Sequence, residues 1–565
     1  MPEFDVVVLG GGTAGVHVAA EVASGGRSVA LVEAGLVGGE SPYLACLPSK
    51  TLLEAAGRGE AWENAVARRD EVASHLDDTA AASRLTEAGV TLLRGTGQVT
   101  RPGTVKVTTY GENGAPTSAT DKSGAGHTID LGYTDLVLST GSEPVAPPIE
   151  GLADIAAWTS AEAMSGPDLP RRLVVLGGGS AGCELAQIYA SFGSQVTLVE
   201  AENVLLPAEA TFTGEILAEA MRRTGVDVRL GSAAVKAERM DEGLVLTLAD
   251  GSRIEADRVL LATGRRPRVS GLGLDSMGVE IKPGTAIPVD TTCRVVAAKD
   301  SGCTGEKATG LWAAGDVTGL GTHTHTARYQ AGVVASNILG QRREADYRAI
   351  PRAVHTMPSV FAVGASPQGA ADAGISMVTA GADLQNTARA RVAGEDAGRV
   401  ELYAHPDTKM LLGAAAVGPN APDWMGEVTV AIRAGVPLPV LADTVHAFPT
   451  YSEALEPVLR ELAGKLADRP GQMPGDLPGG SGPDGSADRS AAASRAATGP
   501  IRTAPEGSAP GGTGAPAAPV AAGGDDREVP GNGISGDPGV PRATVADPRG
   551  PEPSAANSDA RSAAS

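Results

Sequence analysis

The residues best suited to chemistry lie in one short segment, residues 38–50, which carries a single thiol and a lysine. Cys46 precedes a helix predicted over residues 49–56, and the positive N-terminal end of a helix favours a thiolate. Position 41 holds a serine, whose hydroxyl cannot be oxidised to a disulfide with Cys46. The segment therefore predicts either a thiol that acts alone or an inert cysteine, because free cysteines are often buried.

The elements that position this segment follow from an internal repeat. Buried-strand patterns at residues 4–9 and 173–176 each lead into a Gly-Gly-Gly-x-Ala-Gly turn and a predicted helix. A second strand then ends on Glu33 in one unit and on Glu200 in the other, each twenty-three positions after the first glycine of its unit. Two units with matching spacing predict two dinucleotide-binding βαβ folds far more strongly than one glycine motif does.

Each glycine of these turns has a mechanical reason. The first permits the turn from strand to helix, the second lets the backbone approach a pyrophosphate, and the third lets the helix pack closely on the strand. The pyrophosphate then lies at the helix N-terminus, and the terminal carboxylate accepts hydrogen bonds from a ribose. The glycines are Gly10, Gly12 and Gly15 in the first unit and Gly177, Gly179 and Gly182 in the second.

Segment 38–50 resembles the redox-active stretch of the pyridine nucleotide-disulfide oxidoreductases, whose pattern is Gly-Gly-x-Cys-x-x-x-x-Cys-x-Pro-Ser-Lys. The second cysteine is Cys46 and the Pro-Ser-Lys run is intact, whereas Ser41 stands for the first cysteine. The resemblance covers about residues 4–465 and implies FAD in the N-terminal unit and a nicotinamide nucleotide in the internal one. Glu200 would repel a 2′-phosphate and no arginine follows it closely, so NADH is favoured over NADPH.

Further motifs assign cofactor contacts by the same resemblance. Segments containing Thr140-Gly141 and Gly264 match the two Thr-Gly crossovers between the domains of that family. Gly315-Asp316 matches its second FAD motif, in which the aspartate hydrogen-bonds the flavin ribityl chain. A Gly-Asp turn alone would be unremarkable, but its place after two βαβ units makes this motif specific.

The resemblance also implies roles at the reacting centre. Cys46 would lie against the flavin and, as a thiolate, donate charge to it. Lys50 would lie beside the flavin N5 edge and pair with Glu184. The pair would hold a positive charge where the hydride arrives, which stabilises reduced flavin.

The C-terminal signature departs from the family. Disulfide-reducing relatives carry His-Pro-Thr-x-x-Glu, whose histidine acts as acid and base in the partner subunit's site. Phe448 takes the place of that histidine, and phenylalanine cannot transfer a proton. The orienting glutamate remains as Glu453, and His446, two positions before Phe448, is a candidate replacement.

Composition narrows the classes of partner. The chain has 565 residues and a formal net charge of −21, which argues against nucleic acid, because phosphate binding needs clustered basic residues. We expect no signal peptide and no membrane span, and therefore a cytoplasmic protein. So few cysteines in so long a chain indicate a protein of the reducing cytosol. Cys293 and Cys303 are not expected to form a metal site, because no further His or Cys completes a ligand set. The cysteines are Cys46, Cys183, Cys293 and Cys303.

The patterns predict an α/β fold with two Rossmann-like dinucleotide-binding domains, a C-terminal α+β dimerisation domain and a disordered tail. Residues 97–133 predict a β-meander. Beyond residue 350, the patterns predict antiparallel strands at 360–364, 388–403 and 410–417 and helices at 423–434 and 453–467. From Pro470 on there is no aromatic residue, so the tail cannot bury enough apolar surface to fold. The expected domains are 1–145 (FAD-binding, first part), 146–270 (NAD(P)-binding), 271–348 (FAD-binding/central, second part), 349–468 (dimerisation) and 469–565 (tail).

The flavin and nicotinamide parts are thus complete, while both parts that handle a substrate disulfide are altered. We predict a homodimeric FAD-dependent oxidoreductase that passes electrons from NADH through flavin to a small acceptor such as a quinone, without a dithiol relay. A pocket beside Ser41, Cys46, Phe448 and Tyr451 would suit a flat apolar acceptor. One alternative is a thiol-dependent disulfide reductase or dihydrolipoyl dehydrogenase-like enzyme that uses Cys46. Another is a non-catalytic redox sensor, against which the intact lysine–glutamate pair argues.

Overall fold

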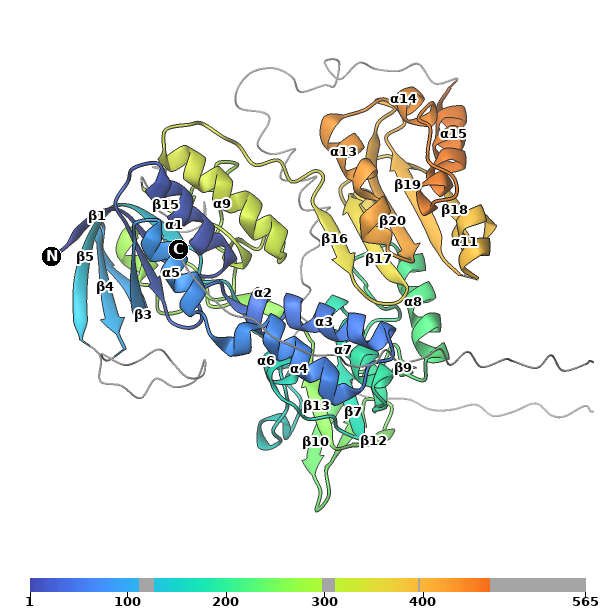
Figure 1. Ribbon diagram of the computed structural model, residues 1–565, viewed down its shortest axis with the longest axis horizontal. Coiled ribbons are helices and arrows are strands. Elements are labelled where there is room, and N and C mark those ends of the chain that lie inside the picture. Colours follow the sequence, from blue (N-terminus) through green and yellow to red (C-terminus); the bar gives the residue numbers. More distant parts are fainter. Residues whose placement is uncertain (111–126, 297–309, 395–396, 468–565) are drawn as a thin grey trace, which may run out of the picture. The chain divides into compact units, whose positions relative to one another are not determined.

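Two strand–turn–helix units at equivalent positions organise the chain in the computed structural model (Figure 1). The structure describes residues 1–110, 127–296, 310–394 and 397–467. The predicted disordered tail, Cys303 and part of the predicted β-meander lie outside these described residues.

The first unit is built on a sheet whose central strands are buried on both faces. β1 (Glu3–Leu9) pairs in parallel with β2 (Val29–Glu33) and β5 (Thr128–Leu138), and β2 continues to β3 (Val90–Arg101). β4 (Thr104–Thr109) joins β3 to β5 with antiparallel pairing, and β15 (Leu311–Ala313) adds to β5 in parallel. Val6 and Val8 enter one apolar cluster and Val7 and Leu9 another, because alternate side chains point to opposite faces.

Helices from distant parts of the chain cover this sheet and connect it to the second unit. α1 (Thr13–Ser24), α5 (Thr79–Glu87) and α9 (Thr324–Ile338) share one apolar cluster with β1. α2 (Glu40–Tyr43) follows the first unit, and α3 (Cys46–Gly57) and α4 (Trp62–Val72) pack with the second unit in another apolar cluster. The segment with the predicted thiol therefore lies between the two nucleotide units.

The second unit repeats the first on a smaller scale. A parallel sheet in the order β13-β7-β8-β9 carries α6, α7 and α8, and an antiparallel sheet of β10, β11 and β12 is attached to it. The bounds are α6 (Ser160–Ser165), β7 (Arg172–Leu176), α7 (Ser180–Ser191), β8 (Gln195–Val199), α8 (Thr211–Arg223), β9 (Asp227–Arg229), β10 (Ala234–Arg239), β11 (Leu244–Leu248), β12 (Arg253–Ala256) and β13 (Arg258–Leu261). Two short strands, β6 (Ser142–Pro144) and β14 (Arg265–Pro267), pair where the chain enters and leaves this unit.

The C-terminal part is an antiparallel sheet in the order β16-β17-β20-β19-β18 with helices packed against it. This confirms the predicted α+β class. The strands are β16 (Pro351–Val354), β17 (Ser359–Gly364), β18 (Val378–Asp383), β19 (Arg399–Ala404) and β20 (Leu411–Gly418). The helices are α10 (Pro367–Asp372), α11 (Ala388–Ala393), α12 (Ala421–Trp424), α13 (Gly426–Ala434), α14 (Leu438–Ala442) and α15 (Leu455–Leu466).

Two predicted elements differ from the structure. The strand expected over residues 388–403 is wrong in its first part, because α11 occupies 388–393 and only β19 is extended. Hydrogen bonds at its start explain the helix: Glu453 Oε1 accepts the N–H of Ala388 at 2.9 Å, and Thr387 Oγ1 accepts that of Ala390 at 3.1 Å. The helix expected from residue 49 begins at Cys46, so the thiol lies in its first turn.

Candidate active site

The two glycine turns have the same backbone geometry. Gly10 and Gly177 have φ angles of 100° and 104°, which favour glycine over other residues. A Cβ on Gly10 would lie 2.3 Å from the carbonyl oxygen of Ser139, and one on Gly177 would lie 2.4 Å from that of Ala262. The backbone just before each Thr-Gly pair therefore excludes any side chain at the first glycine.

The remaining glycines divide into packing positions and open positions. A Cβ on Gly15 or Gly182 would lie 1.8 Å from the carbonyl oxygen of the first glycine of its own turn, so both pack helix against strand. A Cβ on Gly179 would meet nothing within 4 Å, and one on Gly12 only the Cα of Gly39 at 4.0 Å. Gly12 and Gly179 also cap α1 and α7 without a side-chain hydrogen bond. Both helix ends thus leave backbone N–H groups and space for a pyrophosphate.

The two terminal acids also hold equivalent positions. Glu33 accepts hydrogen bonds from the N–H groups of Gly11 and Gly35, and Glu200 accepts from those of Gly178 at 2.5 Å and Glu202 at 2.8 Å. Burial raises the pKa of Glu33, while the bonds from Gly11 and Gly35 oppose this shift. Each carboxylate is fixed beside its own glycine turn, where a ribose hydroxyl can reach its remaining lone pairs.

The two Thr-Gly crossovers are bonded to each other. β6 and β14 pair antiparallel, Thr140 Oγ1 donates to the carbonyl of Arg268 at 2.6 Å, and the N–H of Arg268 donates to Gly141 at 2.9 Å. The carbonyl of Gly264 accepts the N–H of Val145 at 3.1 Å. These bonds hold the entry to the second unit against its exit.

Sequence reasoning missed a polar chain that runs from this crossover pair to the predicted flavin aspartate. Ser142 Oγ donates to Asp316 Oδ2 at 2.7 Å and accepts from Arg265 Nε at 2.7 Å. Arg265 Nη2 also forms an ion pair with Glu40 Oε2 at 2.7 Å. Gly315, beside Asp316, donates its N–H to Gln330 of α9 at 2.7 Å. Arg265 therefore connects Asp316, through Ser142, with α2, the helix that carries Ser41.

The structure brings the predicted lysine and glutamate together. Lys50 Nζ on α3 lies 2.6 Å from Glu184 Oε2 on α7, and the Glu184 side chain is only 6% exposed. The second oxygen, Glu184 Oε1, accepts the backbone N–H of His355 at 2.8 Å. Burial, followed by the positive charge of Lys50, lowers the pKa of His355. One buried carboxylate thus joins α3, α7 and the turn after β16.

The predicted thiol has a hydroxyl neighbour that sequence reasoning did not name. Thr324 Oγ1, at the start of α9, lies 3.6 Å from Cys46 Sγ and 2.9 Å from Ser41 Oγ. Cys46 is partly exposed, whereas Cys183 and Cys293 are buried, and burial raises the pKa of both. Because Thr324 is distant from Cys46 in sequence and no motif marks it, only the fold reveals the contact.

The C-terminal residues of the predicted site form a separate group in the described chain. His446 Nε2 lies 2.9 Å from Glu427 Oε1, its Nδ1 lies 3.4 Å from Glu456 Oε1, and its side chain is 4% exposed. Glu453 accepts backbone N–H groups at the start of α11. Phe448 is 77% exposed, whereas Tyr451 is buried in the C-terminal core. His446 and Glu453 are thus held by their own domain, and only Phe448 projects outward.

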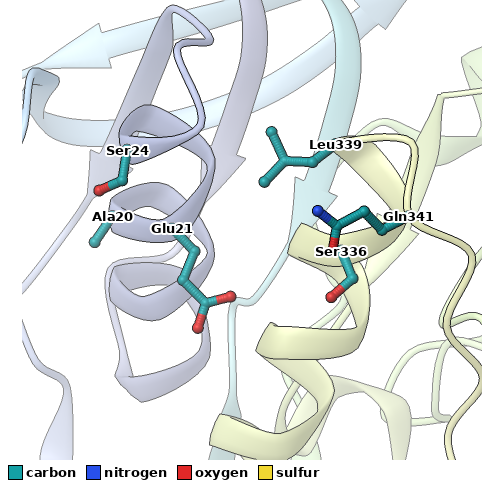
Figure 2. A pocket seen from close by; sticks show the side chains of 6 residues that line it. All are labelled: Ala20, Glu21, Ser24, Ser336, Leu339 and Gln341. Carbon is teal, nitrogen blue, oxygen red and sulfur yellow. The ribbon is translucent and has the colours of Figure 1, made fainter.

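Two surface depressions lie apart from the nucleotide turns. A pocket between the C-terminal ends of α1 and α9 is lined by Glu21, Ser336 and neighbouring side chains (Figure 2). It contains none of the predicted site residues and lies at the opposite end of α1 from Gly12. A groove of about 690 Å³ in the C-terminal domain is lined by His446, Phe448 and Glu453, among others.

The two strand–turn–helix units and the Lys50–Glu184 pair are arranged as the resemblance to a flavin-dependent pyridine nucleotide oxidoreductase implies. The sequence matches the family described as pyridine nucleotide-disulphide oxidoreductase over residues 4–331 and its dimerisation domain over residues 350–458. The chain belongs to the pyridine nucleotide-disulphide oxidoreductase family. Among the described residues, no group of His, Cys, Asp and Glu is arranged to hold a metal ion, and no helix has the length and apolarity to cross a membrane.

The chain aligns with nearly the whole length of several curated relatives. The chain is 31% identical to "Dihydrolipoyl dehydrogenase 3" of Haloarcula marismortui over 478 residues, covering 80% of this chain and 94% of the relative. It is 32% identical to a dihydrolipoyl dehydrogenase of Thermus scotoductus over 480 residues (80% and 96%). It is also 32% identical to a mercuric reductase of Streptomyces lividans over 475 residues (80% and 95%).

Solved structures agree with the fold. The HOCl-induced flavoprotein disulfide reductase RclA from Escherichia coli superposes with a TM-score of 0.70 at 25% identity, covering 81% of this chain and 99% of that one. A protein named LpdA from Mycobacterium tuberculosis superposes with a TM-score of 0.70 at 24% identity, covering 82% and 100%.

Proposed function

We propose that the protein passes electrons from NADH through FAD to a small acceptor such as a quinone, without a dithiol/disulfide relay. The bound flavin supplies the two-electron chemistry between nicotinamide and acceptor. The residues present fit both nucleotides, because Gly12 and Gly179 leave open backbone at two uncapped helix ends. Asp316, held by Ser142, is the acceptor we assign to the flavin ribityl chain.

The observation that carries the proposal is the surroundings of Cys46. A dithiol relay needs two thiols that reach each other, because the dithiol gives up its two electrons by forming a disulfide. In the described part of the chain the other cysteines are buried elsewhere, and position 41 offers a hydroxyl bonded to Thr324. Hydride transfer at the Lys50–Glu184 pair needs no such relay.

The exposed Phe448 side chain of the dimerisation domain supports the choice of an apolar acceptor. The match to the family's dimerisation domain supports a homodimer, and Phe448 at 77% exposure is a large apolar side chain that a partner would cover. We assign Phe448 of the partner subunit to the wall of the acceptor pocket that faces Cys46. It presents an aromatic face and no proton, which suits a flat apolar acceptor better than a thiol. A cytoplasmic location remains part of this proposal.

Glu200 carries the preference for NADH. Its carboxylate is fixed beside the second glycine turn, where it bonds a ribose 2′-hydroxyl and repels a 2′-phosphate. Replacing Glu200 by alanine should weaken NADH binding about tenfold, as expected for hydrogen bonds to a charged group. Replacing Glu202, which contributes its backbone N–H to Glu200, should leave NADH binding unchanged. Equal effects of the two substitutions would refute this assignment.

A thiol-dependent reductase is the second candidate, because Cys46 is partly exposed and the relatives include dihydrolipoyl dehydrogenases and a disulfide reductase. An anaerobic titration separates the two. NADH should bleach the flavin, and a water-soluble quinone should restore its absorbance faster than lipoamide or a small disulfide does. Faster reoxidation by lipoamide would replace the proposal with the thiol mechanism. Failure of NADH to bleach the flavin would refute the nicotinamide site.

A further inference from the structure

Arg268 follows β14 and is fixed by its backbone beside the first glycine turn. Its N–H donates to the carbonyl of Gly141 at 2.9 Å, and its carbonyl accepts from Thr140 Oγ1 at 2.6 Å. Thr140 in turn lies against the glycine turn, because a Cβ on Gly10 would lie 3.0 Å from the Thr140 Cα. The Arg268 side chain therefore starts next to the turn to which we assign the pyrophosphate of FAD.

The guanidinium of Arg268 is held only loosely by the protein. Nη1 lies 3.5 Å from the carbonyl oxygen of Thr140, Nε lies 3.9 Å from Glu143 Oε2, and the side chain is 50% exposed. Glu143 instead binds Arg266 closely, with 2.8 Å between Glu143 Oε1 and Arg266 Nε. Because a guanidinium has five N–H donors, most of those on Arg268 have no close partner in the described part of the chain.

The positive charge of Arg268 acts on the acid of the first turn. Burial raises the pKa of Glu33, and two backbone hydrogen bonds and then the charges of Arg94 and Arg268 oppose this shift. Arg94 is already paired, because it binds both carboxylate oxygens of Asp78, at 2.7 and 2.8 Å. A diphosphate at this turn adds negative charge beside Glu33, in a chain whose formal net charge is −21. Arg268 is thus a cation placed to offset that repulsion.

We propose that Arg268 donates hydrogen bonds to the diphosphate of FAD. Arginine suits this role, because its planar fork of donors matches phosphate oxygens and its charge is kept throughout the working pH range of proteins. Arg268 then adds a charged side chain to the backbone N–H groups at the start of α1, which no side chain caps. The inference rests on the assignment of FAD to the first unit and is independent of the electron acceptor.

The test is the binding of FAD to the full chain after its flavin has been removed, followed by quenching of flavin fluorescence. ADP and adenosine serve as competitors, because both carry the ribose that Glu33 can bind but only ADP carries the diphosphate. Arg268→Gln should weaken the binding of FAD and of ADP about fivefold, as expected for charge-assisted hydrogen bonds at a half-exposed group. Adenosine should compete equally well in the variant and the wild type, which also shows that the site is folded.

The matched control is Arg266→Gln, two residues earlier, whose side chain is 56% exposed and pairs with the same Glu143. This variant should bind FAD, ADP and adenosine as the wild type does. Wild-type affinity for ADP in Arg268→Gln overturns the inference. An equal loss of ADP and adenosine binding also overturns it, because Arg268 would then only fix the crossover. Failure of the wild-type chain to bind FAD would refute the FAD site, and the inference with it.

Discussion

Lys50 Nζ lies 2.6 Å from Glu184 Oε2, although α3 and α7, which carry the two residues, are far apart in the sequence. The carboxylate is almost completely buried and its other oxygen is bonded to the backbone of His355. The pair therefore holds the Lys50 ammonium of α3 in a fixed position against α7. Such charge stabilises a developing anion most strongly where water is excluded.

Removing that charge should slow hydride arrival. Lys50→Met should lower the rate of flavin reduction by NADH about a hundredfold, the usual effect of removing one electrostatic group at a reacting centre. The measurement is stopped-flow loss of flavin absorbance. Glu54→Gln, on the same helix with its side chain 70% exposed, should reduce flavin at the wild-type rate. Similar rates for Lys50→Met and the wild type would remove the pair from the mechanism.

Alanine substitutions at two glycines of the second turn should affect nucleotide binding and folding separately. Gly179→Ala places a methyl group in open space at an ordinary φ of −72°, so stability should stay within about 0.5 kcal/mol while nucleotide binding is lost. Gly182→Ala places its Cβ 1.8 Å from the carbonyl oxygen of Gly177 and should unfold the second unit. Thermal unfolding and calorimetric titration with NAD⁺ check both. Normal NAD⁺ affinity in Gly179→Ala would contradict the pyrophosphate assignment.

His446 should prove structural. Its ring nitrogens face Glu427 and Glu456 of its own domain. His446→Gln should cost about 1 kcal/mol of unfolding free energy, because the carboxylates are partly exposed, and should leave turnover unchanged. Urea unfolding and steady-state assays measure the two effects. Loss of turnover at unchanged stability would restore His446 as a replacement for the missing base.

His323, next to Thr324, should make the protein sensitive to acid. Burial lowers the pKa of His323 to about 4, with His325, Arg352 and Lys50 adding to the shift and Glu209 opposing it. Between pH ~6.5, the unfolded value, and about 4, the unfolded chain binds a proton that the native state does not. The free energy of unfolding should therefore fall as pH falls through this window, by at most about 1.4 kcal/mol per pH unit from this group.

Replacing the ring tests this directly. His323→Gln should flatten the pH dependence of urea unfolding between about pH 4.5 and 6.5, whereas His75→Gln, at an exposed histidine, should retain the wild-type slope. Identical slopes in the wild type and His323→Gln would mean that the ring takes up its proton in the folded state as easily as in the unfolded chain.

The repeated parts of the fold could be predicted because their signals are local. Each unit has a buried strand, three glycines with distinct steric duties and an acid at a fixed interval, and the structure gives both units the same clashes and hydrogen bonds. Lys50 and Glu184 could be paired in advance only through the resemblance to a known family, because nothing in either local pattern points to the other.

Other features depend on contacts between distant segments. Residues 388–392 alternate apolar and polar side chains, which is typical of a strand, yet Glu453 binds the first N–H groups of a helix there. The Thr324–Cys46 contact and the Arg265–Glu40 pair also join segments far apart in sequence. No periodicity or spacing encodes such pairs, so sequence patterns alone do not predict them.

The central claim is that electrons leave the flavin without passing through a thiol relay. Its most direct test is anaerobic stopped-flow reoxidation of NADH-reduced Cys46→Ser enzyme by a water-soluble quinone. The account predicts a rate within about threefold of the wild type, since a thiolate that only tunes the flavin changes the barrier by less than about 1 kcal/mol. A variant that NADH still reduces but quinone no longer reoxidises would contradict it.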